Sequence, residues 1–405
     1  MARLLFLTSR LPWPPREGHQ LRSWHVLSAL AEQHEVTLLS FRRADDAAPD
    51  GEWTRMLAGL ETFPIPSEAS PVALAGALAR GVATGRPFVA AKYASAALQR
   101  RLAVLAEDAD LVHFDMLPLM ANVHVVPEGI PVTLNAHNVE HRLLAQRAQQ
   151  APGALARAFL HGQLPKLQAF EAAACRRADL VLACSATDAA ELRALAPSAE
   201  IHVVPNGVDL AANRPEAAPS GAELAFVGQM GWFPNRDGVE WFLDEIFPRV
   251  LARRPDARFV LVGKPGDLEV PAAVASQVRV AGFVPDVRPL LHAAAVYVVP
   301  LRAGSGTRLK VLEAMALGKA IVTTTVGSEG IDLADGHSAR FADDAGSFAD
   351  AVVALLDDPD TATRLGATAR TVAEAHYGWE AIGRDLRDLY ARALAHRSSA
   401  AFLTA

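Results

Sequence analysis

The sequence has few of the features that mark disulfide-rich, membrane-spanning or nucleic-acid-binding proteins. Its 405 residues include only 2 cysteines, Cys175 and Cys184, and their spacing fits no metal or redox motif, so we expect both to be reduced in a cytosolic protein. The nearest approach to a membrane span, residues 71–83, contains Arg80 and is shorter than the roughly 18 apolar residues that a spanning helix needs. The net charge of −6 offers no basic excess that would attract nucleic acid.

No targeting segment is predicted either. The apolar run within residues 1–15 is too short for a signal peptide and is interrupted by Arg10. We therefore expect a cytoplasmic protein, with attachment to the inner face of the membrane as the alternative. A chain of this length exceeds one ordinary domain, and its 51% hydrophobic content suits two well-filled cores.

Several catalytic motifs are also missing. The sequence has no G-x-S-x-G and no H-E-x-x-H, which disfavours the common serine and zinc hydrolases. Its Asp108-Ala109-Asp110 precedes a predicted strand, whereas ligands of parallel sheets bind where strands end. No G-x-G-x-x-G follows the first strand, which disfavours a dinucleotide oxidoreductase. We therefore expect no metal and no cofactor, and phosphate groups would be neutralised by arginine and lysine.

What the sequence does contain is a regular alternation of strand-like and helical patterns, which predicts an α/β protein with parallel sheets covered by helices. In the first half we expect strands near residues 4–7, 36–40, 111–114, 132–135, 180–183 and 201–204, and helices near 19–31, 93–106, 138–149, 153–177 and 186–194. In the second half we expect strands near 224–227, 259–262, 278–281, 296–299 and 321–324, and a last helix near 379–395. The best linker is the Pro-, Ala- and Asn-rich segment 206–220.

The most informative segment lies between residues 300 and 330. A strand is followed by the turn Gly304-Ser305-Gly306, by a helix over residues 308–317 with Thr307 as its N-cap, and by a strand near residues 320–325. Glycines at such a turn let backbone N–H groups approach a ligand at the helix N-terminus, where anions are favoured.

Charged side chains in the same helix indicate more closely which ligand binds there. Arg308 and Lys310 place positive charge in the first turn, which is unfavourable for an isolated helix and suits a bound phosphate. Glu313, one turn later, would accept hydrogen bonds from sugar hydroxyls. The segment therefore predicts a nucleotide-diphosphate site.

These residues resemble the donor motif of family 4 glycosyltransferases with the GT-B fold. The matching pieces, in family order, are residues 204–209 (VPNGVD), 226–228 (FVG), 262–264 (VGK), 282–286 (GFVPD) and 313–316 (EAMA). The resemblance implies two Rossmann-like domains that face each other across a cleft, and a retaining transfer of a sugar to an acceptor hydroxyl. It also implies domains at 1–205 (acceptor) and 206–377 (donor), with a helix at 378–405 that crosses back to the first.

Two departures from the family pattern point to a subgroup. The family commonly has two glutamates eight positions apart, and Ser305 stands where the first would be. After Gly228, where many members have two cations, only Arg236 is positive. The pattern G-x-G-T-R-x-K resembles exopolysaccharide-type members, in which Arg308 and Lys310 would supply the missing charge.

On the donor side, the resemblance implies contacts from residues spread over both halves of the chain. We expect donor binding by Gly18, Gly228, Arg236, Gly263, Lys264, Val284, Ser305, Gly306, Thr307 and Glu313. The donor would be a UDP- or GDP-linked sugar, which acts as a co-substrate. The acceptor would be a glycan or a lipid-linked glycan, and peripheral membrane association is a further possibility.

On the acceptor side, His137 resembles the family histidine that contacts the reacting sugar or the acceptor hydroxyl. It follows the predicted strand 132–135, and the near-neutral pKa of histidine suits proton handling. Glu140, one turn later, would orient it. We expect His137, Arg308 and Lys310 to be the catalytic residues, whereas His113 is expected to have a structural or surface role.

Two other functions fit the same pattern. A nucleotide-sugar epimerase can use the same fold, and only its product distinguishes it from a transferase. A two-lobed binding protein of periplasmic type is the non-enzymatic alternative, and it would require export.

Overall fold

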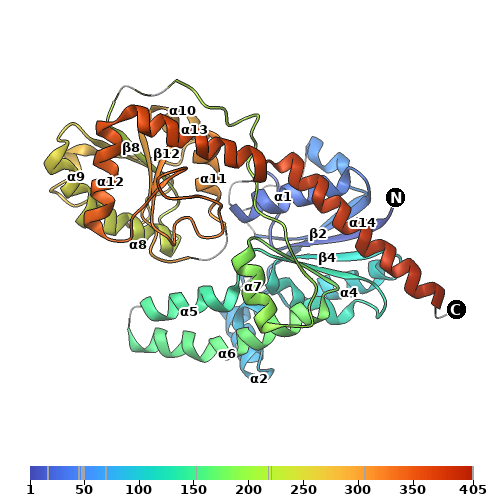
Figure 1. Ribbon diagram of the computed structural model, residues 1–405. Helices are drawn as coiled ribbons and strands as arrows, with labels where there is room; N and C mark the ends of the chain where they lie inside the picture. The colour runs from blue at the N-terminus through green and yellow to red at the C-terminus, as the bar shows by residue number, and fades with distance from the viewer. Residues whose placement is uncertain are drawn as a thin grey trace. The chain divides into compact units, whose positions relative to one another are not determined.

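The computed structural model describes residues 1–15, 18–43, 46, 51–68, 71–151, 153–217, 219, 221–304 and 307–403. The chain forms two compact units, the first made of Met1–Pro205 with Ile382–Ala405 and the second of Asn206–Ala381. Each unit contains one parallel β-sheet with helices packed on it (Figure 1). The predicted fold class, two Rossmann-like α/β domains, is confirmed.

The sheet of the first unit has seven parallel strands in the order β3-β2-β1-β4-β5-β6-β7. These are β1 (Arg3–Thr8), β2 (Glu35–Arg42), β3 (Gly59–Pro64), β4 (Leu111–Asp115), β5 (Val132–Ala136), β6 (Leu180–Ala183) and β7 (Ile201–Val203). The central strands are almost entirely buried because helices cover both faces, which explains their continuous apolar runs.

The helices of this unit follow the strands in sequence. They are α1 (Gly18–Ala31), α2 (Pro71–Ala83), α3 (Phe88–Tyr93), α4 (Ala96–Ala106), α5 (Glu140–Gln150), α6 (Ala154–Arg177) and α7 (Ala186–Leu195), with short 3₁₀ helices η1 (Glu52–Met56), η2 (Pro66–Glu68) and η3 (Leu117–Val125). Helices α5 and α6 run side by side as a pair (Figure 1).

Two local differences from the sequence expectation have clear causes. The single helix expected over residues 93–106 is divided, because Ser95 adopts an extended conformation and its side chain accepts a hydrogen bond from Leu98 N as the N-cap of α4. Strand β3 was not predicted because its residues mix polar, glycine and proline positions, and it pairs only with β2 at the edge of the sheet.

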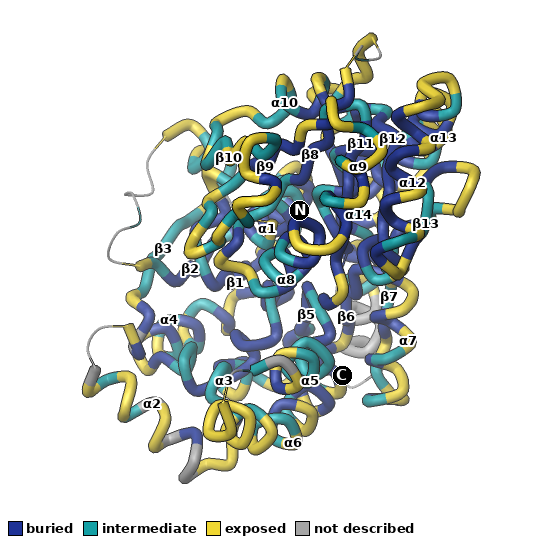
Figure 2. The backbone as a smooth tube through the Cα atoms, turned by 90° about the vertical axis from the view of Figure 1, so that its left-hand side faces the viewer, coloured by how far each residue is buried: buried dark blue, intermediate teal, exposed yellow. Residues whose placement is uncertain are grey.

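The sheet of the second unit has six parallel strands in the order β10-β9-β8-β11-β12-β13. These are β8 (Glu223–Val227), β9 (Arg258–Val262), β10 (Val278–Gly282), β11 (Val296–Val299), β12 (Ala320–Thr323) and β13 (Arg340–Phe341). Figure 2 shows β8, β11 and β12 in the colour of buried residues, whereas helices on the outside carry exposed positions.

The helices of the second unit include one π-helical segment, in which each hydrogen bond spans five residues instead of four. They are α8 (Phe233–Trp241), the π-helical η4 (Phe242–Ile246), α9 (Phe247–Arg253), η5 (Ala275–Gln277), α10 (Arg288–Ala293), α11 (Leu309–Ala316), α12 (Ala345–Asp357) and α13 (Pro359–His376). The N-cap of α11 is Arg308 rather than the expected Thr307, so this helix begins one residue later than predicted.

The last helix, α14 (Trp379–Leu403), returns to the first unit. Ile382, Leu386 and Tyr390 recur every four residues and are buried, as expected for one face of a helix. Arg387 also forms an ion pair of 2.6 Å with Glu32 at the end of α1. Among the residues that the structure describes, none of the helices combines the length and the apolar character needed to cross a bilayer.

Candidate functional site

The loops that follow β8 and β9 touch through two glycines. Gly263 has φ +128°, a conformation that glycine adopts readily, and a Cβ on it would lie 2.2 Å from the carbonyl oxygen of Gly228. Gly228 N in turn donates to Val262 O at 2.8 Å, and Met230 N donates to Lys264 O at 3.0 Å. The glycines therefore let the two loops meet at the carboxyl ends of adjacent strands, where parallel sheets bind ligands.

Lys310 reaches from α11 to the same loops. Its Nζ lies 2.5 Å from Asn235 Oδ1 and 4.1 Å from the centre of the Phe226 ring. A Cβ on Gly228 would come within 2.8 Å of this ammonium group. The structure thus brings together three of the predicted donor or catalytic positions, Gly228, Gly263 and Lys310.

Burial shifts the pKa of both charged residues on this face of α11. It lowers the pKa of Lys310 to about 7, and the nearby positive charge of Arg308 acts in the same direction. Burial raises the pKa of Glu313 to about 7, which the charge of Lys310 opposes. Both groups therefore change protonation near neutral pH, and a bound diphosphate would favour the charged form of Lys310.

Arg308 is folded against its own loop. It is buried, its Nη2 donates to Val326 O at 3.3 Å, and a Cβ on Gly304 would lie 2.6 Å from this nitrogen. Thr307 is buried beside it. Ser305 and Gly306, which we expected to contact the donor, lie outside the described residues.

The remaining donor-side positions of this unit are more peripheral. Arg236 is engaged by two surface carboxylates, Glu240 at 2.8 Å and Asp267 at 2.6 Å. Lys264 is exposed, and Val284 is half-buried in the loop after β10. Lys264 directly follows Gly263 in the loop after β9, whereas Arg236 lies on α8 and Val284 in the loop after β10.

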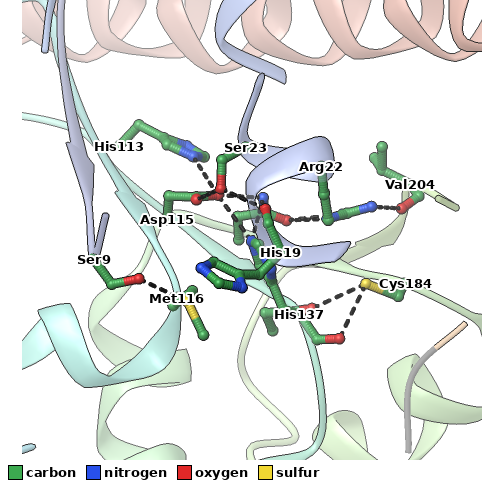
Figure 3. Close-up of polar contacts among 12 residues, drawn as sticks. Ser9, His19, Arg22, Ser23, His113, Asp115, Met116, His137, Cys184 and Val204 are labelled. Carbon is green, nitrogen blue, oxygen red and sulfur yellow. Dashed lines mark hydrogen bonds and ion pairs between the residues drawn. The ribbon is translucent and has the colours of Figure 1, made fainter. Parts of the chain in front are cut away.

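In the first unit, His137 is held by residues at the ends of β4 and β5 (Figure 3). Its Nε2 lies 3.0 Å from Asp115 Oδ1 and 3.2 Å from Asn135 Nδ2. Asn135 Nδ2 also donates to Asp115 Oδ1 at 2.6 Å. All three side chains are buried. The orienting partner is therefore Asp115, a role that we had expected for Glu140.

Two residues of α1 support this group, Ser23 at the Asp115 carboxylate and Arg22 at Asn135. Ser23 Oγ donates to Asp115 Oδ2, and Arg22 binds Asn135 Oδ1 through Nε and Nη2 at 2.9 and 2.8 Å. Burial alone would raise the pKa of Asp115, but His137 and His113 outweigh it and hold that pKa well below the usual range. Asp115 is therefore an anion at neutral pH.

The first turn of α5, next to His137, is fixed by Glu171 on α6. This buried carboxylate accepts from Glu140 N at 2.8 Å, and from His141 N at 3.2 Å and His141 Nδ1 at 2.6 Å. Burial, together with the charge of Glu171, raises the pKa of Glu140 to about 7.

Gly18 is the first residue of α1 and is exposed, one turn before the Arg22–Ser23 pair of the same helix.

Sequence reasoning missed several of these residues. Asp115 and Asn135 are the last polar residues of two adjacent strands, which was the available signal. His113, expected to be structural or at the surface, is fully buried with Nε2 at 3.7 Å from Asp115 Oδ1. Asn235 had no signal beyond its place in the loop after Gly228.

Comparison with known proteins finds two adjoining family matches. Residues 18–212 match the model described as Glycosyltransferase Family 4, and residues 221–358 match the one described as Glycosyl transferases group 1. One similar curated protein is the phosphatidyl-myo-inositol mannosyltransferase of Mycolicibacterium smegmatis, 30% identical over 200 residues, which are 46% of this chain. The match spans 50% of that relative's length.

Solved structures show the same fold over nearly the whole chain. Sucrose-phosphate synthase from Thermosynechococcus elongatus has a TM-score of 0.70 at 20% identity and covers 97% of this chain and 100% of its own. The Anabaena protein HepE in complex with UDP-glucose has a TM-score of 0.67 at 14% identity, and the match covers 97% of this chain and 100% of the HepE chain. At these identities the likeness concerns the fold alone.

Proposed function

This chain belongs to the group 1, family 4 glycosyltransferases, and we propose that it is a retaining, metal-independent hexosyltransferase. It takes a sugar from a nucleotide-diphosphate donor and transfers it to an acceptor hydroxyl. The donor is UDP- or GDP-linked, and the product is an exopolysaccharide or another glycan.

The observation that carries this proposal is the placement of Lys310 over Gly228. The half-buried amino group of Lys310 stands where two glycine loops leave backbone room, at the carboxyl ends of β8 and β9, and such a position suits the phosphates of a nucleotide. Departure of the nucleotide diphosphate is the difficult step. Lys310, Arg308 and the N-terminus of α11 would stabilise the negative charge that grows on it.

The contact between His137 and Asp115 supports a role for His137 at the acceptor. Because Asp115 is an anion, the hydrogen bond at 3.0 Å assigns the ring proton to Nε2. In the neutral form of this tautomer Nδ1 carries no proton, and it can accept a hydrogen bond from a sugar or acceptor hydroxyl. Asp115 would also stabilise the ring if it took up a proton.

The acceptor proposed is a glycan or a lipid-linked glycan, and with a lipid-linked acceptor the protein would attach to the inner face of the membrane. Its support is a set of exposed apolar side chains on two helices of the first unit, Val72 (81% exposed) on α2 and Leu155 (89%) and Phe159 (48%) on α6. Apolar side chains exposed singly are ordinary, but when they gather in one patch they mark a surface that binds a membrane or a protein. Co-sedimentation with anionic lipid vesicles tests this part, and equal binding by Leu155→Ser with Phe159→Ser would contradict it.

One experiment tests the function. Thermal unfolding is measured with UDP, GDP and ADP, each with and without EDTA. A ligand at about a hundred times its Kd stabilises a protein by ~2.7 kcal/mol. We expect one diphosphate to stabilise the protein equally with and without EDTA. Loss of that effect in EDTA would contradict metal independence.

Turnover with the matching donor sugars then separates the alternatives. Transfer to an added acceptor, with the anomeric configuration retained in the NMR spectrum of the product, supports the proposal. Release of an epimerised nucleotide sugar would identify an epimerase. Binding of a sugar without any turnover would favour the non-enzymatic binding protein.

A further inference from the structure

Tyr390 connects α14 to the strand that carries Asp115. Its side chain is fully buried, and its hydroxyl lies 2.5 Å from His113 Nδ1 and 3.1 Å from Thr133 Oγ1. His113 stands on β4 two residues before Asp115, and Thr133 stands on the neighbouring β5. A buried phenol hydroxyl is normally hydrogen-bonded, and here its partners lie directly beside the residues that hold His137.

The contacts of His113 define which nitrogen carries its proton. Burial lowers the pKa of His113, so the ring is neutral at physiological pH. Its Nε2 faces the Asp115 anion at 3.7 Å, which favours the proton on that nitrogen. Nδ1 is then an acceptor that both the Tyr390 hydroxyl, at 2.5 Å, and the Thr133 hydroxyl, at 2.9 Å, can reach as donors.

We propose that Tyr390 is a positioning residue for His137 and acts through His113 and Asp115. This inference rests on the proposed function, in which His137 works at the acceptor. By donating to Nδ1, the Tyr390 hydroxyl keeps the His113 ring neutral and its N–H directed at the carboxylate. The Asp115 Oδ1 atom is then shared by one neutral neighbour and by His137 Nε2 at 3.0 Å.

Loss of the Tyr390 hydroxyl would remove the shorter of the two hydrogen bonds at His113 Nδ1 and leave the one to Thr133 Oγ1 at 2.9 Å. The ring could then reverse its proton position or become charged, and a charged His113 would compete with His137 for the same carboxylate oxygen. The other charged group near His113 is Arg22, which is fixed on Asn135 and Val204 O. Its positive charge lowers the pKa of His113 and so acts against a charged ring. The expected result is a His137 ring with mixed proton positions.

The test is Tyr390→Phe, which removes one oxygen and keeps the ring. We expect kcat to fall about tenfold, the effect of one weakened hydrogen bond, with the Kd for the nucleoside diphosphate within twofold. Side-chain ¹⁵N chemical shifts of His137 report which ring nitrogen carries the proton. They should change from values typical of one proton position to values typical of a mixture of the two positions. In a His137→Ala background, Tyr390→Phe should change the residual turnover less than twofold.

The matched control is Tyr377→Phe, which removes another buried phenol hydroxyl, the one that accepts from Asp332 N at 2.8 Å in the second unit. It should leave the His137 ¹⁵N shifts and kcat unchanged. Wild-type His137 shifts in Tyr390→Phe, or an equal loss of turnover with and without His137, would overturn the inference. If Tyr390→Phe does not fold, the ¹⁵N spectrum of the wild-type protein gives a second test. A His113 proton on Nδ1 in that spectrum would also overturn the inference.

The ¹⁵N readout also separates this inference from the proposed function. If the protein transfers no sugar but its His137 shifts respond to Tyr390→Phe, the proposed function is wrong, whereas the effect of Tyr390 on the His137 ring stands. A transferase whose His137 shifts do not respond would keep the function and remove Tyr390 from it.

Discussion

Lys310 and Glu313 lie three residues apart on one face of α11, half-buried, and each has a pKa of about 7. Burial moves the two values in opposite directions, downward for the ammonium and upward for the carboxyl group. Each residue influences the other through its charge. The proposed nucleotide site therefore contains two groups that titrate near neutral pH, and its ligand affinity should depend on pH in a specific way.

We predict that the affinity for nucleoside diphosphate is highest near pH 7. A bound diphosphate stabilises charged Lys310, so binding takes up a proton above pH 7 and affinity falls by up to about tenfold per pH unit. Glu313 must be ionised to accept from ribose hydroxyls, so affinity also falls below pH 7. Titration calorimetry from pH 5.5 to 9 measures both limbs. A flat profile would contradict the assignment.

Single substitutions should remove the two pH-dependent losses of nucleotide affinity, the alkaline limb above pH 7 and the acidic limb below it, one at a time. Lys310→Met should abolish the alkaline limb, and Glu313→Gln should abolish the acidic limb. Each should weaken binding about ten- to a hundredfold, because a charge-assisted hydrogen bond contributes about 1.5–3 kcal/mol. Circular dichroism checks folding. An unchanged nucleotide Kd in folded Glu313→Gln would remove Glu313 from the site.

His137→Ala should affect turnover far more than nucleotide binding. We expect kcat to fall about 10²–10⁴-fold, the range for a positioned proton-handling group, while the nucleotide Kd changes less than about tenfold. Steady-state rates and calorimetry measure the two quantities. His202→Ala is the control, because this histidine pairs with Glu200 at the surface and should have no effect. Near-normal turnover in His137→Ala would make the residue structural.

Asp115→Asn should reproduce much of that loss. The substitution keeps the size of the side chain but removes the negative charge that orients His137, so we expect at least about a hundredfold decrease in kcat. Asp110→Asn, at the other end of β4, is the matched control. Its carboxylate accepts from Arg3 N at 2.8 Å. If both variants retained full turnover, the orienting role of Asp115 would be wrong.

Gly263→Ala should distort the donor loops. Its Cβ would meet Gly228 O at 2.2 Å in a strained backbone conformation, which we expect to cost about 1–3 kcal/mol or more and to weaken nucleotide binding. Gly266→Ala also has a positive φ, +58°, but its nearest neighbour would be 3.7 Å away. It should therefore lower the melting temperature less and leave the nucleotide Kd unchanged. Equal effects of the two substitutions would contradict the close approach.

Periodicity and turn chemistry were enough to predict the layers of this protein. Buried parallel strands appear as short apolar runs, and Gly304, Gly318 and the cations between them mark the start and end of α11. Lys310 and Glu313 could be selected because helical spacing alone places residues three apart on one face. The limits of these elements were less predictable where a single cap, such as Ser95, divides a helix.

The sequence by itself determined the buried strands that form short apolar runs, and that cations and glycines meet at the start of one helix. Only the tertiary structure decided which side chains surround His137. Asp115 and Asn135 become neighbours because β4 and β5 pair in parallel with these residues opposite each other, and Tyr390 reaches Thr133 across 257 residues of chain. Local patterns do not encode strand register or the docking of a distant helix, because both depend on how buried surfaces fit together in three dimensions.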